Sequence, residues 1–268
     1  EQPEIVTQVH ADYIKAGAKT HTLNTYSATP RRLKRAGQYS QIASIHAQAF
    51  SLLEQAIEQT HSDVDIAGSL GPLIGSYRNQ PEDEWQTLQA EYAELVELQA
   101  RADVLLIETM TNTKEATAAA AAAKASGKPY AVSFRLEPDG RLKSGESLMQ
   151  AVEAVKPYAP SAILLNCSAP HELTAAMPQL ASSYPCVGGY ANAFESIDAV
   201  AKGQLVDELH ARDDITPKVY SQQVHHWLKA GARVVGGCCE ITPEHIQRLS
   251  DDLRQDGYRL VRFSELSK

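Results

Sequence analysis

The feature that most restricts the fold of this sequence is a regular alternation of short apolar runs with longer helical stretches. The runs are rich in Val, Ile and Leu, which is typical of strands buried on both faces of a parallel sheet. We predict strands at Thr20–Asn24, Val64–Gly68, Val104–Glu108, Tyr130–Phe134, Ala162–Asn166, Val187–Tyr190 and Arg233–Gly236.

The stretches between these runs have the composition and the end signals of helices. One is almost pure alanine and stops at Gly127, a residue type common just past a helix C-terminus. Thr242 and Pro243 are typical of an N-cap and a first helical position. The predicted helices are Pro3–Ala16, Tyr39–Gln59, Pro81–Ala102, Thr113–Ser126, Ser147–Lys156, Pro170–Ala181, Pro217–Ala230 and Pro243–Gln255.

Repeated βα units without a break in composition predict a single α/β domain over residues 1–268, with 258–268 as a candidate tail. The length of 268 residues is ordinary for a (βα)8 TIM-type barrel. The pattern opens on a helix and supplies seven strands instead of eight, so we expect a first strand that lies before Glu1 and is absent from this chain. The alternative is a doubly wound open sheet, but no G-x-G-x-x-G follows any predicted strand. Tyr258–Phe263 is weakly strand-like and is expected to form an edge strand or a tail.

Charge and composition argue against several classes of protein. The net charge is −8 with no long basic block, whereas a nucleic-acid partner requires a basic face. No apolar run reaches the roughly 18 residues of a membrane span, and no secretory signal opens the chain. Only four cysteines in a chain of this length indicate reduced thiols rather than a disulfide scaffold. These properties favour a cytoplasmic metabolic protein that acts on small molecules.

Three of the four cysteines follow predicted strands and form a candidate metal site. Cys167 ends one strand, while Cys238 and Cys239 end the last, and catalytic groups of barrels sit at these strand ends. Three thiolates bind zinc and leave one open position, which is the catalytic pattern. Adjacent cysteines can share an ion only if the backbone turns, and the two preceding glycines supply that freedom. The alternative is that all four cysteines, Cys186 included, are small buried hydrophobic residues.

The segments Leu165-Asn166-Cys167 and Gly236-Gly237-Cys238-Cys239, in this order, resemble the homocysteine S-methyltransferase family. That family includes betaine–homocysteine methyltransferase and the S-methylmethionine-dependent enzymes. The likeness covers residues 3 to about 254. Further segments that carry it are His10–Ala18, Asn24–Tyr26, Gly68–Pro72 and Leu106–Thr109.

The resemblance implies a barrel enzyme that uses Zn2+, held by Cys167, Cys238 and Cys239, to move a methyl group to the thiol of homocysteine, which yields methionine. The donor is a sulfonium or quaternary ammonium compound: S-methylmethionine, S-adenosylmethionine or betaine. Glu108 matches the carboxylate that holds the homocysteine amino group. The other residues expected to line the substrate pocket are Asn24, Tyr26, Ser69, Asn166 and Asn192.

Two departures from the family pattern affect the expected site. The first strand of the family carries an Asp-Gly-Gly-type segment, which this chain does not contain. The seventh strand of the family usually ends in Tyr-Pro-Asn, where this chain has Tyr190-Ala191-Asn192. Two alternatives to the expected activity therefore stand. The acceptor is another small thiol or a selenol, or the protein is an inactive or truncated zinc-binding or thiol redox protein of the same fold.

Overall fold

The computed structural model describes residues 2–77, 83–195 and 210–266, and its core is a sheet of seven parallel strands. Each strand pairs with the next one along the chain. The strands are β1 (Thr20–Thr22), β2 (Asp65–Leu70), β3 (Val104–Met110), β4 (Tyr130–Phe134), β5 (Ala162–Asn166), β6 (Val187–Tyr190) and β7 (Val234–Val235). This sequential order rules out a doubly wound sheet, in which the strand order reverses.

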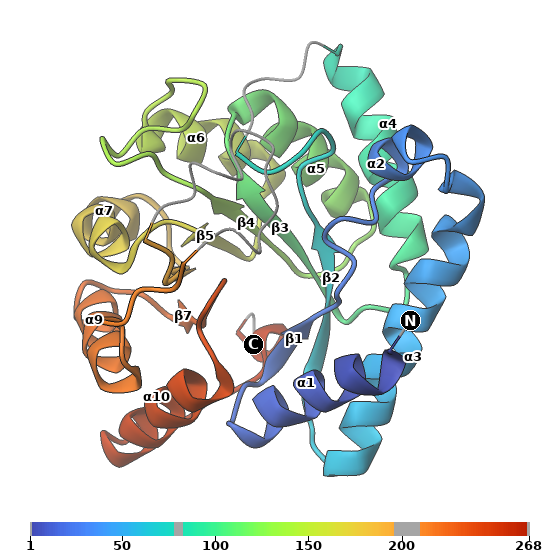
Figure 1. The fold of residues 1–268 in the computed structure, drawn as a ribbon. Coiled ribbons are helices and arrows are strands. Elements are labelled where there is room, and N and C mark those ends of the chain that lie inside the picture. The colour runs from blue at the N-terminus through green and yellow to red at the C-terminus, as the bar shows by residue number, and fades with distance from the viewer. Residues whose placement is uncertain (1, 78–82, 196–209, 267–268) are drawn as a thin grey trace.

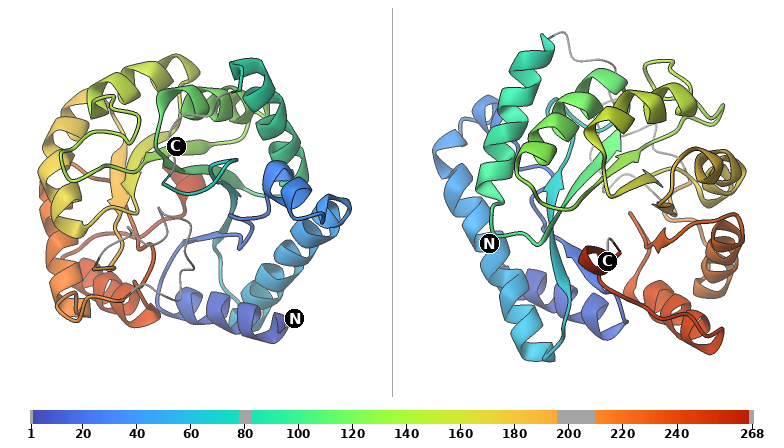
Figure 2. Two further views of the ribbon diagram at one scale, coloured as in Figure 1. Left: turned by 45° about the horizontal axis from the view of Figure 1, so that its top comes forward. Right: turned by 180° about the vertical axis from the view of Figure 1, so that it is seen from behind.

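The helices form a ring outside the curled sheet, as Figures 1 and 2 show. Between β1 and β7 the described residues make no strand pairing, so the sheet is an open half-barrel that lacks one strand. The predicted barrel class is thereby confirmed. The helices are α1 (Pro3–Lys15), α2 (Pro30–Arg35), α3 (Ile42–Thr60), α4 (Trp85–Leu98), α5 (Thr113–Ala125), α6 (Leu148–Val155), α7 (Pro170–Ser183), α9 (Pro217–Lys229) and α10 (Pro243–Gln255), with short 3-10 turns at Tyr39–Gln41, Lys156–Tyr158 and Phe263–Glu265.

Alternation along the strands separates two hydrophobic layers. In β3, Leu105 and Ile107 belong to the large cluster between the sheet and the helices. Val104 and Leu106 face the other way and belong to a smaller cluster inside the half-barrel. Because successive side chains of a strand point to opposite faces, Glu108 continues the inner row. The sheet thus directs a carboxylate to the inside of the barrel at its carboxyl edge.

The helix predictions needed two corrections. The helix α2 was missed because its six residues are too few to show a periodic pattern. The side chain of Thr29 caps this helix by accepting a hydrogen bond from the backbone N–H of Arg32. The helix predicted from Pro81 begins at Trp85 instead, since Glu84 has extended backbone angles. Pro81 itself lies outside the described residues.

The C-terminal segment closes the floor of the half-barrel. Of the two options for Tyr258–Phe263, an edge strand or a tail, the edge strand was wrong. Phe263 packs in the inner cluster, and its backbone N–H donates to Thr20 Oγ1 at 3.1 Å. The N–H of Ser264 donates to Asp65 Oδ2 at 2.7 Å. Side chains at the starts of β1 and β2 thus accept the hydrogen bonds that a strand would exchange with a neighbour, so the segment crosses the floor without joining the sheet.

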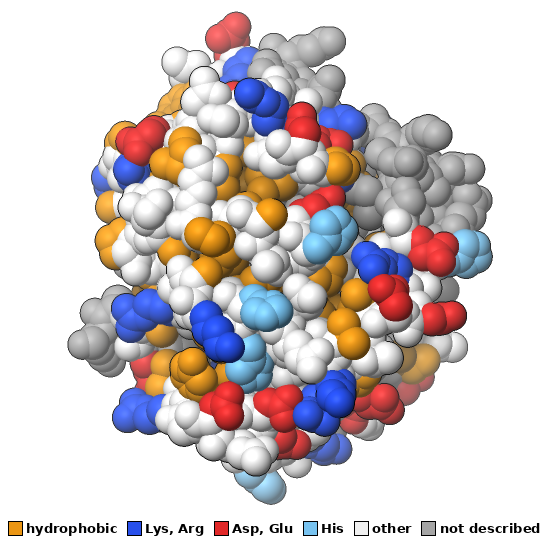
Figure 3. Space-filling model, turned by 90° about the vertical axis from the view of Figure 1, so that its left-hand side faces the viewer, with side chains coloured by type: hydrophobic (Ala, Val, Ile, Leu, Met, Phe, Trp, Pro, Cys, Tyr) orange, Lys and Arg blue, Asp and Glu red, His pale blue; other side chains and the backbone are white. Residues whose placement is uncertain are grey.

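The surface shown in Figure 3 carries acidic and basic side chains interspersed, without a concentrated basic area on that face. Within the described parts of the chain, no helix has both the length and the hydropathy needed to traverse a bilayer. The expectation that no nucleic acid binds rests on the net charge and stays a prediction.

Replacing Phe263 by alanine will destabilise the fold, because it empties the inner layer where Phe263 is only 8% exposed. We expect the free energy of unfolding to fall by about 3 kcal/mol, the usual cost of removing a buried aromatic side chain. Urea denaturation followed by circular dichroism measures the change. Tyr258→Ala is the matched control because Tyr258 is 47% exposed. Equal losses in the two variants would contradict a role for Phe263 in closing the floor.

Candidate metal centre

Three sulfur atoms from distant parts of the chain meet at the carboxyl edge of the sheet. Cys167 Sγ lies 3.0 Å from Cys238 Sγ and 3.9 Å from Cys239 Sγ, and the two adjacent sulfurs lie 3.8 Å apart. Cys167 and Cys238 are separated by 71 residues. In the part of the chain that the structure describes, this is the one group of at least three His, Cys, Asp or Glu residues whose ligand atoms lie close enough to share an ion.

The triangle of sulfurs fits a tetrahedral metal ion. Zinc–sulfur bonds of about 2.3 Å at tetrahedral angles put two sulfurs about 3.8 Å apart. Two of the three separations, 3.9 and 3.8 Å, already match that value. The third pair, at 3.0 Å, is closer and would have to separate on binding. Three soft thiolate ligands suit zinc among the common biological metals.

Backbone contacts hold Cys167 in an uncommon conformation. It follows β5 with a φ of 53°, in the left-handed region that non-glycine residues rarely occupy. The side chain of Asn192 donates from Nδ2 to the carbonyl of Cys167 at 2.7 Å. The N–H of Cys167 in turn donates to the carbonyl of Tyr190 at 3.3 Å. The end of β6 therefore fixes the cysteine at the end of β5.

A tight turn after β7 aims the other two cysteines. The carbonyl of Cys238 accepts from the N–H of Ile241 at 3.2 Å, and Glu240 between them has a φ of 63°. Neither Gly236 nor Gly237, the two glycines expected to give the backbone its freedom to turn, has a positive φ. Gly237 is needed for space instead, because a Cβ there would lie 2.3 Å from Ile241 Cγ2.

The thiols share protons unequally. Hydrogen bonds from Cys167 and Cys238 lower the pKa of Cys239 to about 3. The hydrogen bond that Cys238 makes to Cys167, together with the one to Cys239 and with burial, raises the pKa of Cys238 well above its usual range. The pKa of Cys167 is also raised. These opposite shifts favour the thiolate at Cys239 over a thiolate at either of the other two sulfurs.

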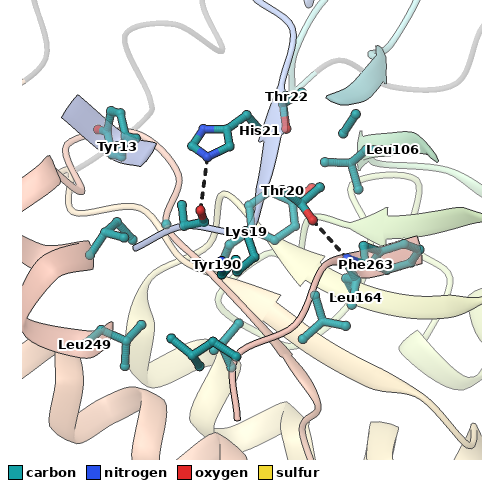
Figure 4. A pocket seen from close by; sticks show the side chains of 18 of the residues that line it. Tyr13, Lys19, Thr20, His21, Thr22, Leu106, Leu164, Tyr190, Leu249 and Phe263 are labelled. Atoms are coloured by element: carbon teal, nitrogen blue, oxygen red, sulfur yellow. Dashed lines mark hydrogen bonds between the residues drawn. The ribbon is translucent and has the colours of Figure 1, made fainter. Parts of the chain in front are cut away.

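A cavity of about 830 Å³ opens where β1 and β7 remain unpaired, and it reaches the metal centre. Its lining runs from Phe263 on the floor, past Thr20 and Thr22 of β1, to Tyr190 (Figure 4). Glu108 and Cys238 lie in the same lining. A carboxyl group and a sulfur of the candidate metal site therefore share one cavity at the carboxyl edge of the sheet.

The carboxyl group of Glu108 is held by its neighbour on β2. Ser69 Oγ donates to Glu108 Oε1 at 2.5 Å. Burial raises the pKa of Glu108 to about 7, the hydrogen bond from Ser69 opposes this rise, and the nearby thiolate of Cys239 adds to it. A positive charge beside Glu108 would lower this pKa and favour the ionised carboxylate.

The remaining residues predicted to line the pocket lie in different environments. Asn24 is exposed, whereas Asn166 is fully buried and makes hydrogen bonds to Thr109 and Ser133. The hydroxyl of Tyr26 lies 2.8 Å from Ser76 Oγ, and the ring of Tyr26 already faces the guanidinium of Arg32 at 5.3 Å. Contact of these residues with a substrate stays a prediction.

The sequence interpretation missed two tyrosines at the site. The hydroxyl of Tyr77 lies 3.1 Å from Cys167 Sγ, and Tyr77 is 7% exposed. Tyr190 lines the cavity from the end of β6. Two signals were available: Tyr77 sits in the loop after β2, and alternation from Gly188 places Tyr190 on the inner face.

A curled parallel sheet with three converging sulfurs at its carboxyl edge defines a class of protein, a barrel with a thiolate metal site. A family model described as Homocysteine S-methyltransferase matches residues 1–253. The chain belongs to this enzyme family.

Individual relatives agree with this assignment. The chain is 32% identical to the homocysteine S-methyltransferase of Escherichia coli strain K12, over 93% of this chain and 84% of the relative. It is 25% identical to betaine–homocysteine S-methyltransferase 1 of Bos taurus, over 94% of this chain but only 65% of that longer protein. Among solved structures, the metallated form of the homocysteine methyltransferase MmuM from Escherichia coli superposes with a TM-score of 0.75, at 27% identity, over 94% of this chain and 85% of that one.

Binding of Zn2+ to the triad will release about two protons near neutral pH. The lowered pKa of Cys239 means that it is already ionised, while the raised pKa values of Cys167 and Cys238 mean that both are still protonated. Metal ligation requires thiolates, so both protons leave. Isothermal titration calorimetry in buffers of different ionisation enthalpy counts them. Cys186→Ser should leave the count unchanged, whereas release of no protons would contradict the described charge state.

Proposed function

We propose that this protein is a zinc-dependent methyltransferase that moves a methyl group from a cationic donor to the thiol of homocysteine and so forms methionine. The observation that carries the proposal is the convergence of Cys167, Cys238 and Cys239 beside a cavity that also holds Glu108. Membership of the family supports the same chemistry.

The triad would hold the zinc ion through its three sulfurs. When bound, zinc supplies a Lewis acid that stabilises a thiolate at neutral pH and leaves one coordination position for the substrate sulfur. The hydroxyl of Tyr77 and the side chain of Asn192 hold Cys167 in place through its sulfur and its carbonyl, respectively. The protein thereby prearranges its ligands before the substrate arrives.

Glu108 would bind the ammonium group of homocysteine. Ser69 fixes the orientation of the carboxyl group, and the cavity lets a small amino acid reach it. A positive charge beside Glu108 favours its ionised form, because the opposite charge compensates for the loss of hydration. Substrate binding and ionisation of Glu108 are therefore coupled.

The methyl transfer itself needs no general acid. The substrate thiolate attacks the methyl carbon, a new carbon–sulfur bond forms, and the bond from that carbon to the cationic sulfur or nitrogen of the donor breaks. The electron pair stays with the donor atom, which leaves neutral. The work of the protein is to activate the thiol and align the two reactants.

The Cys238→Ser variant tests the metal proposal. We expect the wild-type protein, purified under reducing conditions, to contain one zinc per chain by atomic emission spectroscopy and to methylate homocysteine. The variant should lose most of its zinc and its activity, since a hydroxyl is a poor substitute for a thiolate ligand. Cys186→Ser is the control, because Cys186 packs with the inner cluster near Phe263. Wild-type protein that neither contains nor binds zinc would refute the proposal.

The pH dependence of homocysteine binding tests the role of Glu108. Since its pKa is raised to about 7, the carboxyl group becomes neutral as the pH falls through that value, and the attraction for ammonium is lost. Below pH 7 we expect the homocysteine KM of the wild type, divided by that of Glu108→Gln, to rise by up to about tenfold per pH unit. Steady-state kinetics between pH 5.5 and 8.5 measure the ratio, and division by the variant cancels the titration of the thiol. A constant ratio would remove the assigned role.

The donor is identified by a transfer assay with radioactive methyl groups. S-methylmethionine, S-adenosylmethionine and betaine are offered separately with homocysteine. Transfer from one of them at a rate abolished by Cys238→Ser supports the proposed function. Transfer from none, with zinc bound, favours a different donor or the non-enzymatic alternative.

A further inference from the structure

The end of β3 contains an irregularity next to Glu108. Its pairing with β4 matches Ile107 to Val132 but Met110 to Phe134, so three steps along β3 correspond to two along β4. The extra residue lies at Glu108–Thr109, and Thr109 has a φ of 61°. A β-branched residue rarely adopts this left-handed conformation. Bulges of this kind re-aim side chains next to functional sites.

The side chain of Asn166 makes hydrogen bonds to the backbone N–H and the hydroxyl group of Thr109 in this bulge. Its Oδ1 accepts from the backbone N–H of Thr109 at 3.0 Å and from Ser133 Oγ at 2.7 Å. Its Nδ2 donates to Thr109 Oγ1 at 2.9 Å. Asn166 and Ser133 are fully buried, and Thr109 is 2% exposed. One amide side chain on β5 therefore reaches across β4 and ties down the end of β3.

We propose that Asn166 is a positioning residue: its side chain holds the left-handed bulge at Thr109 and thereby aims the carboxylate of Glu108 into the cavity. Asn166 immediately precedes Cys167, so one residue joins the strand end that presents the metal-binding sulfur to the strand end that presents the carboxylate. This role sets the separation of the two groups that bind opposite ends of one small amino acid. It rests on the proposed function only where homocysteine is involved.

The contacts distinguish this role from direct substrate binding. The cavity is lined by Glu108 but not by Asn166. Both polar atoms of the Asn166 amide are already engaged with Thr109 and Ser133. Substitution of Asn166 should thus act through the position of Glu108, whereas the sulfur of Cys167 keeps its own supports from Asn192 and Tyr190.

The first test is structural and independent of activity. In a crystal structure of Asn166→Ala, we expect Thr109 to leave the left-handed region and the contact between Ser69 Oγ and Glu108 Oε1 to break. In the double variant Asn166→Ala/Thr109→Gly, the contact should return in part, because glycine adopts a positive φ without steric cost. An unchanged bulge in Asn166→Ala would overturn the proposal, whether or not the protein methylates homocysteine.

The second test is a double-mutant cycle on homocysteine kinetics. Asn166→Ala should raise the homocysteine KM on the order of tenfold or more while changing kcat less, because it misplaces a binding group. In the Glu108→Gln background the same substitution should change KM by less than about twofold, since coupled residues are not additive. Ser133→Ala removes one of the three hydrogen bonds of the Asn166 side chain and should raise the homocysteine KM by less than Asn166→Ala does.

Ser221→Ala is the matched control for these kinetics. It removes a partly buried hydrogen bond to Asp252 between α9 and α10 and should lower stability without raising KM. If Asn166→Ala raised the homocysteine KM as much in the Glu108→Gln background as in the wild type, the proposal would be overturned. Failure of the proposed function gives a different result, namely wild-type protein without transfer activity but with the structural test still passed.

Discussion

The constraint on which the site depends is the parallel pairing of β5 with β6 and of β6 with β7. It brings Cys167 beside Cys238 although 71 residues separate them, because parallel strands end at the same edge of a sheet. The same pairing sets Asn192, just after β6, against the carbonyl of Cys167. Without this register the three cysteine sulfurs would not lie close enough to share one ion.

Backbone strain is concentrated at that edge. Of the six non-glycine residues with positive φ in the described parts of the chain, His61 and Ala159 end helical segments, whereas the other four surround the site. These four are Tyr77, Thr109, Cys167 and Glu240. Each such residue costs on the order of 1–3 kcal/mol and persists only where its surroundings hold it. Here the surroundings are side-chain amides and strand ends, so the binding groups are set before any ligand arrives.

The gap between β1 and β7 is the place where the expected first strand of the barrel would pair. It makes the cavity that reaches Glu108 and Cys238, while Phe263 fills the opposite end of the half-barrel. In the lining of this cavity, burial raises the pKa of the Glu108 carboxyl group. If Glu108 binds an ammonium group as proposed, the opposite charge offsets the free-energy cost of burying the ionised carboxylate.

The sequence by itself determined the barrel class, the seven strands and the three sulfurs, since short apolar runs and the residues that end them are local signals. It did not reveal that Tyr258–Phe263 crosses the floor, that Tyr77 reaches Cys167, or that Gly237 is needed for space near Ile241. The role of Asn166 shows the same limit: its identity was noticed, but its partners Thr109 and Ser133 lie on other strands. Only the tertiary structure decides such contacts, because they depend on strand register and on a bulge that no local pattern encodes.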